Sequence, residues 1–321
     1  MIREKTEART CKELLEEFNK NSRMKIVEKV IFTGVGGRDV YNITAPFIDE
    51  GQEVVVGRVE ERHSEFSQVF FFSRSNQVWS PREHTHTYNL QDPFITKIYG
   101  ELIFGGVEVI TSPENPNKIV SWVTQFYRGE NIDALCYFAC GPGTMKDIRL
   151  IELADGRIGV FTRPQGKKGG RGQIGFTIIQ SLEELNEATF NNAEIIRNQF
   201  ISEEWGGANE AHLLKNGWVG VLGHIACFDR DRNKHYYSMT FGINPETLES
   251  TPIKIIATRN DFPDGPEKRP DLEDVIFSGG LVRRNDGRAE LSVGVSDAEA
   301  YRIEIPDPFL EYEQFAPALA V

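Results

Sequence analysis

A layout that recurs five times along the chain is the strongest constraint on its fold. Each copy has an apolar segment, a turn containing glycine and a second apolar segment, as in residues 146–164, KDIRLIELADGRIGVFTRP. Successive copies start 50 to 65 residues apart, near Asn42, Asp92, Asp147, Asn209 and Asp274. Short Val-, Ile-, Phe- and Tyr-rich runs between such turns are typical of strands, and each period leaves room for four. The sequence therefore predicts an all-β fold, a five-bladed β-propeller, because a two-domain β-sandwich would not explain the repeat.

Two segments depart from this pattern and predict helices. In the first 20 residues, four apolar side chains fall on one stripe and charged ones on the other: Cys11, Leu14, Leu15 and Phe18. Residues 181–188 begin SLEEL, which resembles a capped helix start. We expect an N-terminal helical extension over residues 1–24 and a single catalytic propeller over residues 25–321. The extension would pack either against the propeller or against another subunit of a homo-oligomer.

Composition limits the classes of partner and the location. The chain has 321 residues, with 48 acidic and 36 basic side chains and a net charge of −12. This excess negative charge repels nucleic acids and anionic membrane surfaces, so neither is expected as a partner. No apolar run approaches the roughly 20 residues that span a bilayer, and the charged N-terminus lacks the apolar core of a secretory signal. The expected location is therefore cytoplasmic.

Cysteine and histidine spacing does not predict a metal site. The four cysteines are too few for a disulfide framework and lack a second pair at zinc spacing, so we expect buried free thiols: Cys11, Cys136, Cys140 and Cys227. His84 and His86 would point to one face of an extended strand. No third His or Cys follows at a convincing spacing, although zinc needs three or four ligands. We expect these histidines in a loop near the pocket, and no bound metal.

Polar residues recur at one end of every predicted blade. The first strands begin with the Asn and Asp residues at which the five copies start. The second strands end with charged or polar groups seven residues after the turn glycine, namely Arg58, Arg163 and His224; Gly294 holds that place in the last copy, with Asp297 three residues further on. In an antiparallel hairpin the start of one strand lies beside the end of the next. The two sets therefore converge on one mouth of the central channel and predict a ligand site there.

The types of side chain in this ring predict a sugar or phosphorylated ligand. Asp and Asn at strand starts often cap turns, but turn capping does not explain why guanidinium, imidazole and carboxylate groups converge. Guanidinium groups bind oxyanions through paired hydrogen bonds. Residues 166–172, GKKGGRG, predict a flexible basic loop beside the site, since they lack the pattern of a P-loop. Six aromatic side chains belong either to the core or to stacking walls for a sugar: Phe47, Tyr88, Phe94, Trp205, Trp218 and Phe277.

Several motifs carry a resemblance to a known family. They are VYN at 40–42, GRVEER at 57–62, QDPFITKI at 91–98, KDIRLIEL followed by FTRP, GWVGVLGHIA before Tyr236, and VGVSDAEA. Over about residues 38–310 the chain resembles family 130 of the glycoside hydrolases, the five-bladed mannoside phosphorylases. It is most similar to a divergent mannosyltransferase- and phosphorylase-like branch of that family.

The resemblance implies a role for each residue. Asp92 would be the general acid, and the phosphate-binding residues would be Arg163, His224 and Tyr236, with Lys146 a weaker candidate. The substrate-binding residues would be Asn42, Arg58, Asp147 and Asp297. The implied reaction is inverting phosphorolysis of β-mannosides, or synthesis from mannose 1-phosphate, in which the proton passes through a substrate hydroxyl and phosphate attacks the anomeric carbon. The implied partner is an oligosaccharide or sugar phosphate, with inorganic phosphate as co-substrate and no cofactor.

Two departures from the family pattern leave alternatives open. Phe94 replaces the arginine of the DPR motif, and the lysine before GW is absent, with His212 or Lys215 as its replacement. Inverting hydrolysis would instead require a second carboxyl group about 6.5–9.5 Å from the acid. The candidate bases are Glu60, Glu210 and Glu273. A non-catalytic carbohydrate-binding propeller is the third alternative.

Overall fold

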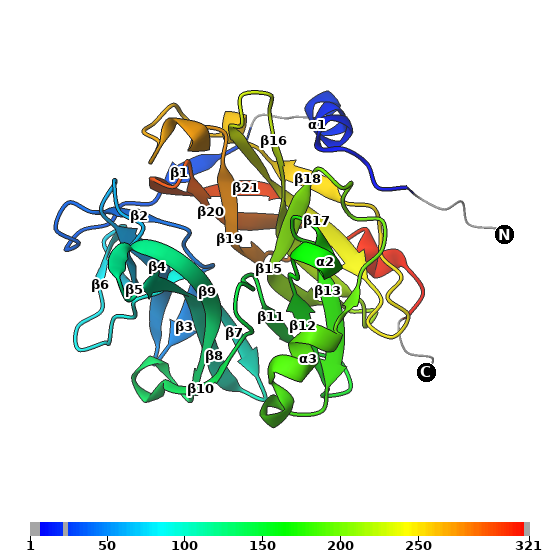
Figure 1. The fold of residues 1–321 in the computed structure, drawn as a ribbon, viewed down its shortest axis with the longest axis horizontal. Helices are drawn as coiled ribbons and strands as arrows, with labels where there is room; N and C mark the ends of the chain where they lie inside the picture. The colour runs from blue at the N-terminus through cyan, green and yellow to red at the C-terminus, as the bar shows by residue number, and fades with distance from the viewer. Residues whose placement is uncertain (1–6, 22–24, 318–321) are drawn as a thin grey trace.

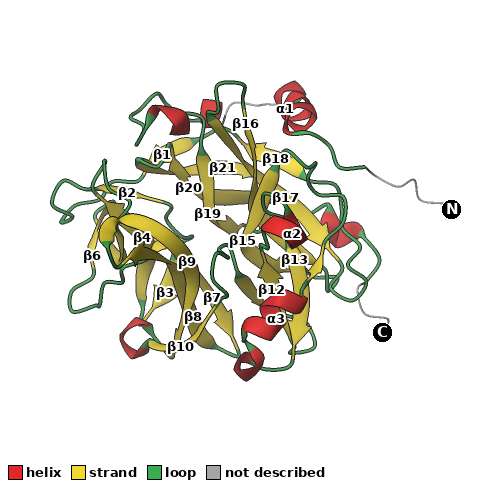
Figure 2. Cartoon of the chain, in the orientation of Figure 1, coloured by secondary structure: helices red, strands yellow, loops and turns green. Residues whose placement is uncertain are grey.

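Five antiparallel sheets surround a central axis in the computed structural model, which describes residues 7–21 and 25–317 (Figure 1). The predicted five-bladed β-propeller and its short N-terminal helix are confirmed. Strands are the main regular structure of the molecule, and the short helices lie at its periphery (Figure 2). Strands β7, β11, β15 and β19 are the first of their blades and face the axis, as the middle of Figure 1 shows.

Each blade takes its strands in chain order. Blade 1 contains β2 (Asp39–Tyr41), β3 (Phe47–Asp49), β4 (Gln52–Glu60), β5 (Ser67–Ser75) and β6 (Val78–Pro81). Blade 2 contains β7 (Gln91–Ile98), β8 (Glu101–Ser112), β9 (Asn115–Gly129) and β10 (Cys136–Cys140). Blade 3 contains β11 (Arg149–Glu152), β12 (Ile158–Thr162), β13 (Gly175–Ile179) and β14 (Glu194–Ile195). Blade 4 contains β15 (Trp205–Leu213), β16 (Val219–Phe228), β17 (Lys234–Ile243) and β18 (Lys254–Ala257).

Blade 5 joins the two ends of the ring. It contains β19 (Ile276–Arg283), β20 (Arg288–Val295) and β21 (Glu299–Pro306), and its outer strand is β1 (Val27–Lys29) from the start of the chain. Strand β1 pairs antiparallel with β21, with Val27 opposite Ile303 and Lys29 opposite Tyr301. This pairing covers the edge that β21 would otherwise expose and fixes blade 5 against blade 1.

Apolar side chains fill the space between neighbouring blades. All five residues of β12, IGVFT, are buried, because this strand packs against a neighbouring blade on each face. Phe161 of blade 3 and Phe241 of blade 4 belong to one cluster, and Phe71 of blade 1 and Phe104 of blade 2 to another. Burying one such ring contributes about 1.5–3 kcal/mol to folding. This packing holds the first strands in the positions that form the central site.

Helix α1 (Cys11–Lys20) packs against blade 4 (Figure 1). Cys11 and Leu14 are buried there, and Leu15 and Phe18 are partly buried in the same cluster, which confirms the predicted stripe. The helix begins later than predicted, because Thr10 caps it and forms a capping box with Glu13. Residues 1–6 of the predicted extension lie outside the described residues. No helix in the described part of the chain is long and apolar enough to cross a membrane.

Two other expectations are corrected. The helix predicted at 181–188 is α3 (Glu187–Asn192), because Asn186 accepts hydrogen bonds from the first backbone N–H groups; only a 3₁₀ turn, Leu182–Glu184, precedes it. All four cysteines are free, but Cys136 and Cys140 are exposed, because β10 is the outermost strand of blade 2. The remaining short helices are α2 (Gly166–Gly169) and the 3₁₀ helices Ile132–Ala134, Arg259–Asp261, Pro270–Leu272 and Tyr312–Gln314.

Candidate active site

The polar residues predicted at the strand starts of blades 1 to 4 converge at one mouth of the channel, whereas that of blade 5 does not. Asn42, Asp92 and Asp147 occupy equivalent places in blades 1, 2 and 3, each with a left-handed backbone, at φ 48°, 47° and 58°. Asn and Asp tolerate this conformation better than other side chains, and such strain concentrates at functional sites. In blade 4, Asn209 lies at a bulge of β15 between Ala208 and Glu210. All four of these polar residues are buried.

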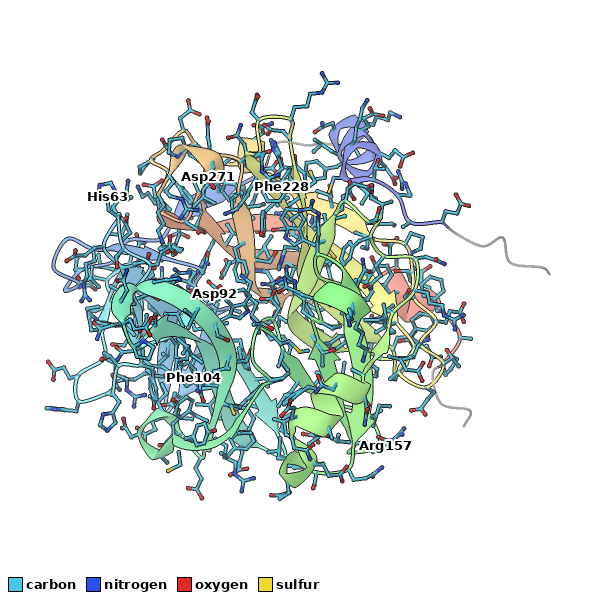
Figure 3. All side chains as sticks on the ribbon, viewed as in Figure 1. His63, Asp92, Phe104, Arg157, Phe228 and Asp271 are labelled. Carbon is cyan, nitrogen blue, oxygen red and sulfur yellow. The ribbon has the colours of Figure 1, made fainter. Side chains whose placement is uncertain are left out.

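Asp92 lies near the middle of the ring of blades (Figure 3). Its Oδ1 accepts a hydrogen bond of 2.7 Å from Nδ2 of Asn42 and one of 3.1 Å from Nη1 of Arg58. Among the described residues, none donates a hydrogen bond to its Oδ2. The side chain is therefore held through one oxygen, while the other oxygen is left to interact with a ligand.

The environment of Asp92 favours its ionised form. Burial by itself would raise the pKa of this carboxyl group, but the positive charges of Arg58 and Lys146 and the hydrogen bond from Asn42 lower it to about 2. The carboxylate is thus ionised at neutral pH when no ligand is bound. It can accept a proton directly, whereas donating one requires a change in the charge around it.

Arg58 is fixed by a buried ion-pair network behind Asp92. Its Nε and Nη2 donate hydrogen bonds of 2.8 and 2.6 Å to Oε2 of Glu60. Glu60 also accepts a hydrogen bond from the hydroxyl of Tyr41 and forms an ion pair with Nζ of Lys268. Because each charge has a partner, the network holds Arg58 rigidly against Asp92. It also occupies Glu60, one of the three candidate hydrolytic bases.

Asp297 brings a second carboxyl group to the Asp92 side of the site. It follows β20 with a left-handed backbone, at φ 51°, and is partly exposed. Burial and the nearby charge of Asp92 raise its pKa, although Arg58 and Lys268 oppose this effect. Among the described residues, it has no hydrogen-bond partner. Two carboxyl groups with pKa values shifted in opposite directions can therefore divide the tasks of proton transfer and hydroxyl binding.

The other half of the site is built around Asp147. Its Oδ2 lies 3.2 Å from Nη1 of Arg163 and 3.9 Å from Nε2 of His224. Arg163 also donates a hydrogen bond of 2.8 Å to the backbone oxygen of Gly206. Only 1% of Asp147 is exposed, so its carboxylate lies behind Arg163 rather than on the surface of the site. This geometry fits a residue that positions Arg163.

His224 is buried and neutral. Desolvation lowers its pKa to about 3, although the Asp147 charge opposes this effect. Its Nδ1 lies 2.9 Å from Oδ1 of Asn209, and its ring stacks against that of Tyr236 at a centroid distance of 5.3 Å. The Tyr236 hydroxyl accepts a 3.1 Å hydrogen bond from Nε1 of Trp205, which leaves the hydroxyl proton available to a ligand. His224 therefore supports Tyr236 without adding positive charge.

A cavity of about 430 Å³ opens beside Arg163, Trp205 and Tyr236. It is lined by four cationic side chains, Lys146, Arg163, Arg171 and Lys234, and one carboxylate, Glu65. Among the described residues, Lys146 and the guanidinium of Arg171 have no ion-pair partner within 4 Å. Unpaired cations beside buried hydrogen-bond donors are suited to bind an anion such as phosphate. The basic loop predicted at 166–172 lies beside this cavity through Arg171, and its first residues form the short helix α2.

Blade 5 differs from the predicted alignment of the polar ring. The position equivalent to Asn209 is Gly279 at the bulge of β19, and not Asp274, which bonds to His235 and Tyr237. A Cβ atom on Gly279 would lie 1.6 Å from the backbone oxygen of Ile43, so no side chain fits there. Likewise a Cβ on Gly294 would lie 1.9 Å from Oδ1 of Asn42. Glycine is required at both places because blade 1 approaches blade 5 closely.

Other candidates lie away from this mouth of the channel. His84 and His86 are exposed in the loop between β6 and β7 and do not line the cavity. The candidate replacements for the missing lysine also lie elsewhere: His212 pairs with Glu210, and Lys215 with Glu313. No described group of three or more His, Cys, Asp or Glu residues is arranged to hold a metal.

The contacts of the remaining candidate bases and aromatics show which of them belong to the site. The Glu210 carboxylate accepts a backbone hydrogen bond from Leu281, and Glu273 is exposed. Of the six candidate aromatics, Trp205 lines the cavity and Phe277 packs against His224. Phe47 and Phe94 line a separate cavity, and Tyr88 and Trp218 also pack away from this site.

Lys268, Tyr41 and Arg171 complete the site and were not identified as functional residues from the sequence. Lys268 reaches Glu60 from the segment before β19, 208 residues away in the chain. Its position depends on the closure of blade 5 against blade 1, which no local pattern encodes. Tyr41 and Arg171 did carry a signal, because they lie next to Asn42 and within the glycine-rich basic loop, respectively.

Comparisons with known proteins agree with this fold. A protein family described as "Protein of unknown function (DUF1861)" matches residues 16–311. The solved structure of a mannose phosphorylase from Leishmania mexicana, in complex with phosphate ion, is 35% identical with a TM-score of 0.86; the match covers 96% of this chain and 98% of that one. That of a GDP-Man-dependent mannosyltransferase from the same organism is 36% identical with a TM-score of 0.87, over 96% and 99% of the two chains.

More distant relatives share parts of this similarity. A 4-O-β-D-mannosyl-D-glucose phosphorylase from Bacteroides fragilis is 25% identical over 158 residues, which is 47% of this chain and 39% of that protein. The chain thus matches about two fifths of the length of that curated relative. The structure of a β-1,2-mannobiose phosphorylase from Listeria innocua is 12% identical with a TM-score of 0.59, over 87% and 93% of the chains, and shows the shared fold. The chain therefore belongs to the DUF1861 family, and it resembles the divergent phosphorylase- and mannosyltransferase-like branch of the family 130 propellers.

Proposed function

We propose that the protein transfers a mannosyl group between phosphate and a sugar hydroxyl, by inverting phosphorolysis of β-mannosides and by the reverse synthesis. The observation that carries this proposal is the position of the cation-lined cavity relative to Asp92. Lys146 lines the cavity, and its charge acts on the buried carboxylate of Asp92. An anion bound there and a proton-transferring carboxyl group would thus serve the same reacting centre.

In phosphorolysis, an oxygen of phosphate forms a bond to the anomeric carbon while the glycosidic C–O bond breaks. The departing oxygen takes the bond electrons and receives the proton of Asp92, directly or through a substrate hydroxyl. Arg163, Lys146 and Tyr236 would hold the phosphate, with Asp147 and His224 behind them. No protein base is needed, because phosphate is itself the nucleophile.

In synthesis the same bonds change in the opposite direction. The acceptor hydroxyl attacks the anomeric carbon of mannose 1-phosphate, its proton passes to Asp92, and phosphate leaves into the cavity. The low pKa of Asp92 supports this direction, since the free site already holds the required carboxylate. For phosphorolysis, bound phosphate would offset the charges of Lys146 and Arg163 and so raise the pKa of Asp92.

Asn42, Arg58 and Asp297 would bind the mannosyl unit beside Asp92. Asp297 is partly exposed and has no hydrogen-bond partner among the described residues, so its carboxylate can accept bonds from sugar hydroxyls. Because Asn42 and Arg58 both donate to Oδ1 of Asp92, they orient its Oδ2 toward the reacting oxygen. This arrangement needs no metal or organic cofactor.

The first test is the dependence of sugar release on phosphate. The protein would be incubated with β-1,2- and β-1,4-mannobiose, with and without phosphate, and mannose and mannose 1-phosphate would be measured. The proposal expects equal amounts of the two products, and only when phosphate is present. Mannose release that does not depend on phosphate would favour hydrolysis, and binding without turnover would favour a carbohydrate-binding propeller.

A nucleotide-sugar donor is a second candidate, favoured by Arg171. Its guanidinium lies on the cavity wall, 5.9 Å from the ring centre of Trp205 and 5.5 Å from that of Phe228, and has no ion-pair partner in the described chain. A second phosphoryl group beyond the first would find a cation there. The 36% identical mannosyltransferase is described as GDP-Man-dependent, so GDP-mannose is the donor to test.

A further inference from the structure

A second cavity, of about 540 Å³, lies between blades 1 and 2 and adjoins the cation-lined one. The two share Gln91, Val107 and Val109 as a common wall. Gln91 directly precedes Asp92 in the chain, and Glu60, which fixes Arg58, also lines the second cavity. This second cavity, here called the blade 1–2 groove, therefore begins beside the residues that hold Asp92.

The groove differs in charge from the cation-lined cavity. Its charged lining consists of three carboxylates and one guanidinium: Glu60, Glu61, Glu108 and Arg38. Nη1 of Arg38 donates a 2.9 Å hydrogen bond to Oε1 of Gln68, and its guanidinium lies over the ring of Phe70. Glu60 is neutralised by Arg58 and Lys268, but among the described residues Glu61 and Glu108 have no ion-pair partner and outnumber the single guanidinium. Phosphate is thus attracted to the blade 3–4 side and repelled from the groove, whereas a neutral ligand meets no such barrier.

The polar side chains of the groove are suited to a sugar chain. Ser64 is fixed in the loop before β5, where its hydroxyl accepts a 2.9 Å hydrogen bond from the backbone N–H of Phe66. In the described chain, the Asn89 amide makes no hydrogen bond, and Gln91 uses only its NH₂ group, which donates to the backbone oxygen of Glu65. Free amide groups can both donate to and accept from hydroxyl groups.

Phe66 adds an exposed aromatic surface to this polar lining. It is 48% exposed, and no other described aromatic ring stacks on it. A partly exposed aromatic ring that lines a groove offers an apolar face on which a ligand can stack. The apolar face of a pyranose ring can stack on it while hydroxyl groups at the ring edge reach Asn89 and Gln91.

Building on the proposed mannosyl transfer, we propose that the blade 1–2 groove binds the part of a neutral oligosaccharide that lies beyond the bond being made or broken. Phosphate or sugar phosphate then occupies the opposite, cation-lined side. The groove thereby sets the orientation of the substrate, and it extends the preferred substrate beyond a disaccharide. Phe66 is the residue that contacts the additional sugar units.

Calorimetry in phosphate-free buffer tests this inference without turnover by phosphorolysis. The probes are mannobiose, mannotriose and mannotetraose in the β-1,2- and β-1,4-linked series, titrated into the whole protein. In the series that binds, Kd should fall about tenfold from the disaccharide to the longer chains, and Phe66→Ala should abolish that gain. Phe66→Trp should keep it, and Asn89→Ala should reduce it. Tyr137→Ala, which removes an exposed aromatic ring on β10, is the matched control and should bind like the wild type.

Three results would overturn the inference: equal Kd values for all chain lengths, a gain that survives Phe66→Ala in folded protein, or no binding in either series. Folding of each variant is checked by its Tm. The outcome is separable from the proposed reaction. A protein that binds longer chains more tightly but forms no mannose 1-phosphate supports the proposed role of the groove and contradicts the proposed phosphorylase activity. A protein that phosphorolyses mannobiose but shows no effect of chain length on binding supports the proposed phosphorylase and contradicts the proposed role of the groove.

Discussion

Asn42 and Asp92 lie 50 residues apart in the chain and at the same place in neighbouring blades, where a 2.7 Å hydrogen bond joins their side chains. Both adopt a left-handed backbone, Asn42 directly after β2 and Asp92 as the second residue of β7. The bond joins two copies of one structural position, so the residue proposed to transfer the proton and the residue that supports it come from equivalent places in neighbouring blades. Arg58 adds a third contact from the second strand of blade 1.

Replacing Asn42 with alanine should reduce activity strongly. The substitution removes a hydrogen bond to a charged group, which contributes about 1.5–3 kcal/mol, so kcat/KM should fall about 10- to 100-fold. The pKa of Asp92 should also rise, since the bond from Asn42 helps to lower it. Steady-state kinetics measures the loss, and Asn191→Ala on the exposed side of α3 is the control. Unchanged kcat/KM in folded Asn42→Ala would show that the contact does not serve the reaction.

Removing the charge of Lys146 should affect both phosphate binding and the ionisation of Asp92. Lys146→Met should raise the KM for phosphate at least about tenfold, while Lys146→Arg retains part of the affinity. The charge of Arg58, that of Lys146 and the hydrogen bond from Asn42 together lower the pKa of Asp92 to about 2, so loss of the Lys146 charge should raise that pKa. In synthesis Asp92 must be ionised, so the acid limb of the pH–rate profile should move to higher pH. Lys167→Met, in the basic loop at 166–172 but outside the cavity lining, is the control. An equal rise in the KM for phosphate in this variant would argue against a specific role of Lys146.

Replacing Arg171 should impair the use of GDP-mannose more than the use of phosphate or mannose 1-phosphate. Arg171→Ala should lower the use of GDP-mannose, with the expected loss on the order of tenfold or more, and leave the KM for phosphate nearly unchanged. The reason is its place on the cavity wall, where only the second phosphoryl group of a diphosphate would need it. Release of GDP and of mannose 1-phosphate would be compared for wild type, Arg171→Ala and the exposed control Arg230→Ala. Equal losses with both donors would contradict this division.

His224 should make the folded protein less stable in mild acid. Its pKa is about 3 in the folded state against an ordinary value of 6.5, so the unfolded chain binds a proton between these values and the folded protein does not. Stability should therefore fall as pH decreases from 6.5 toward 3, by a contribution on the order of 4 kcal/mol. Urea unfolding from pH 7 to pH 4 should show a shallower decline for His224→Gln than for wild type or the exposed control His63→Gln. Parallel curves would mean that His224 is protonated in the folded state.

The sequence predicted the blades more completely than the contacts within the site. The five-fold layout predicted the propeller, because apolar strands and turn glycines are local signals. It also predicted that Asp92, Arg58, Arg163 and His224 lie at one end, since hairpin geometry places them there. The structure refines Asp147, predicted to bind substrate, to a buried residue behind Arg163.

Long-range contacts account for what the sequence could not predict. Gly279, rather than Asp274, completes the ring in blade 5 because the backbone of Ile43 leaves no room for a side chain. Lys268 joins the network of Glu60 only because the ring closes between the first and last blades. Such contacts depend on how the blades pack against one another, and a motif within one blade carries no information about them.

The most direct test of the account compares wild type with Asp92→Asn by ³¹P NMR, using β-mannobiose and phosphate. Asn keeps the size of the side chain while removing the proton that Asp92 would donate. The account predicts α-mannose 1-phosphate from the wild type, as inversion at a β-mannoside requires, and a rate about 10²–10⁴-fold lower from a folded Asp92→Asn variant. Mannose release without mannose 1-phosphate, or an undiminished rate in Asp92→Asn, would contradict it.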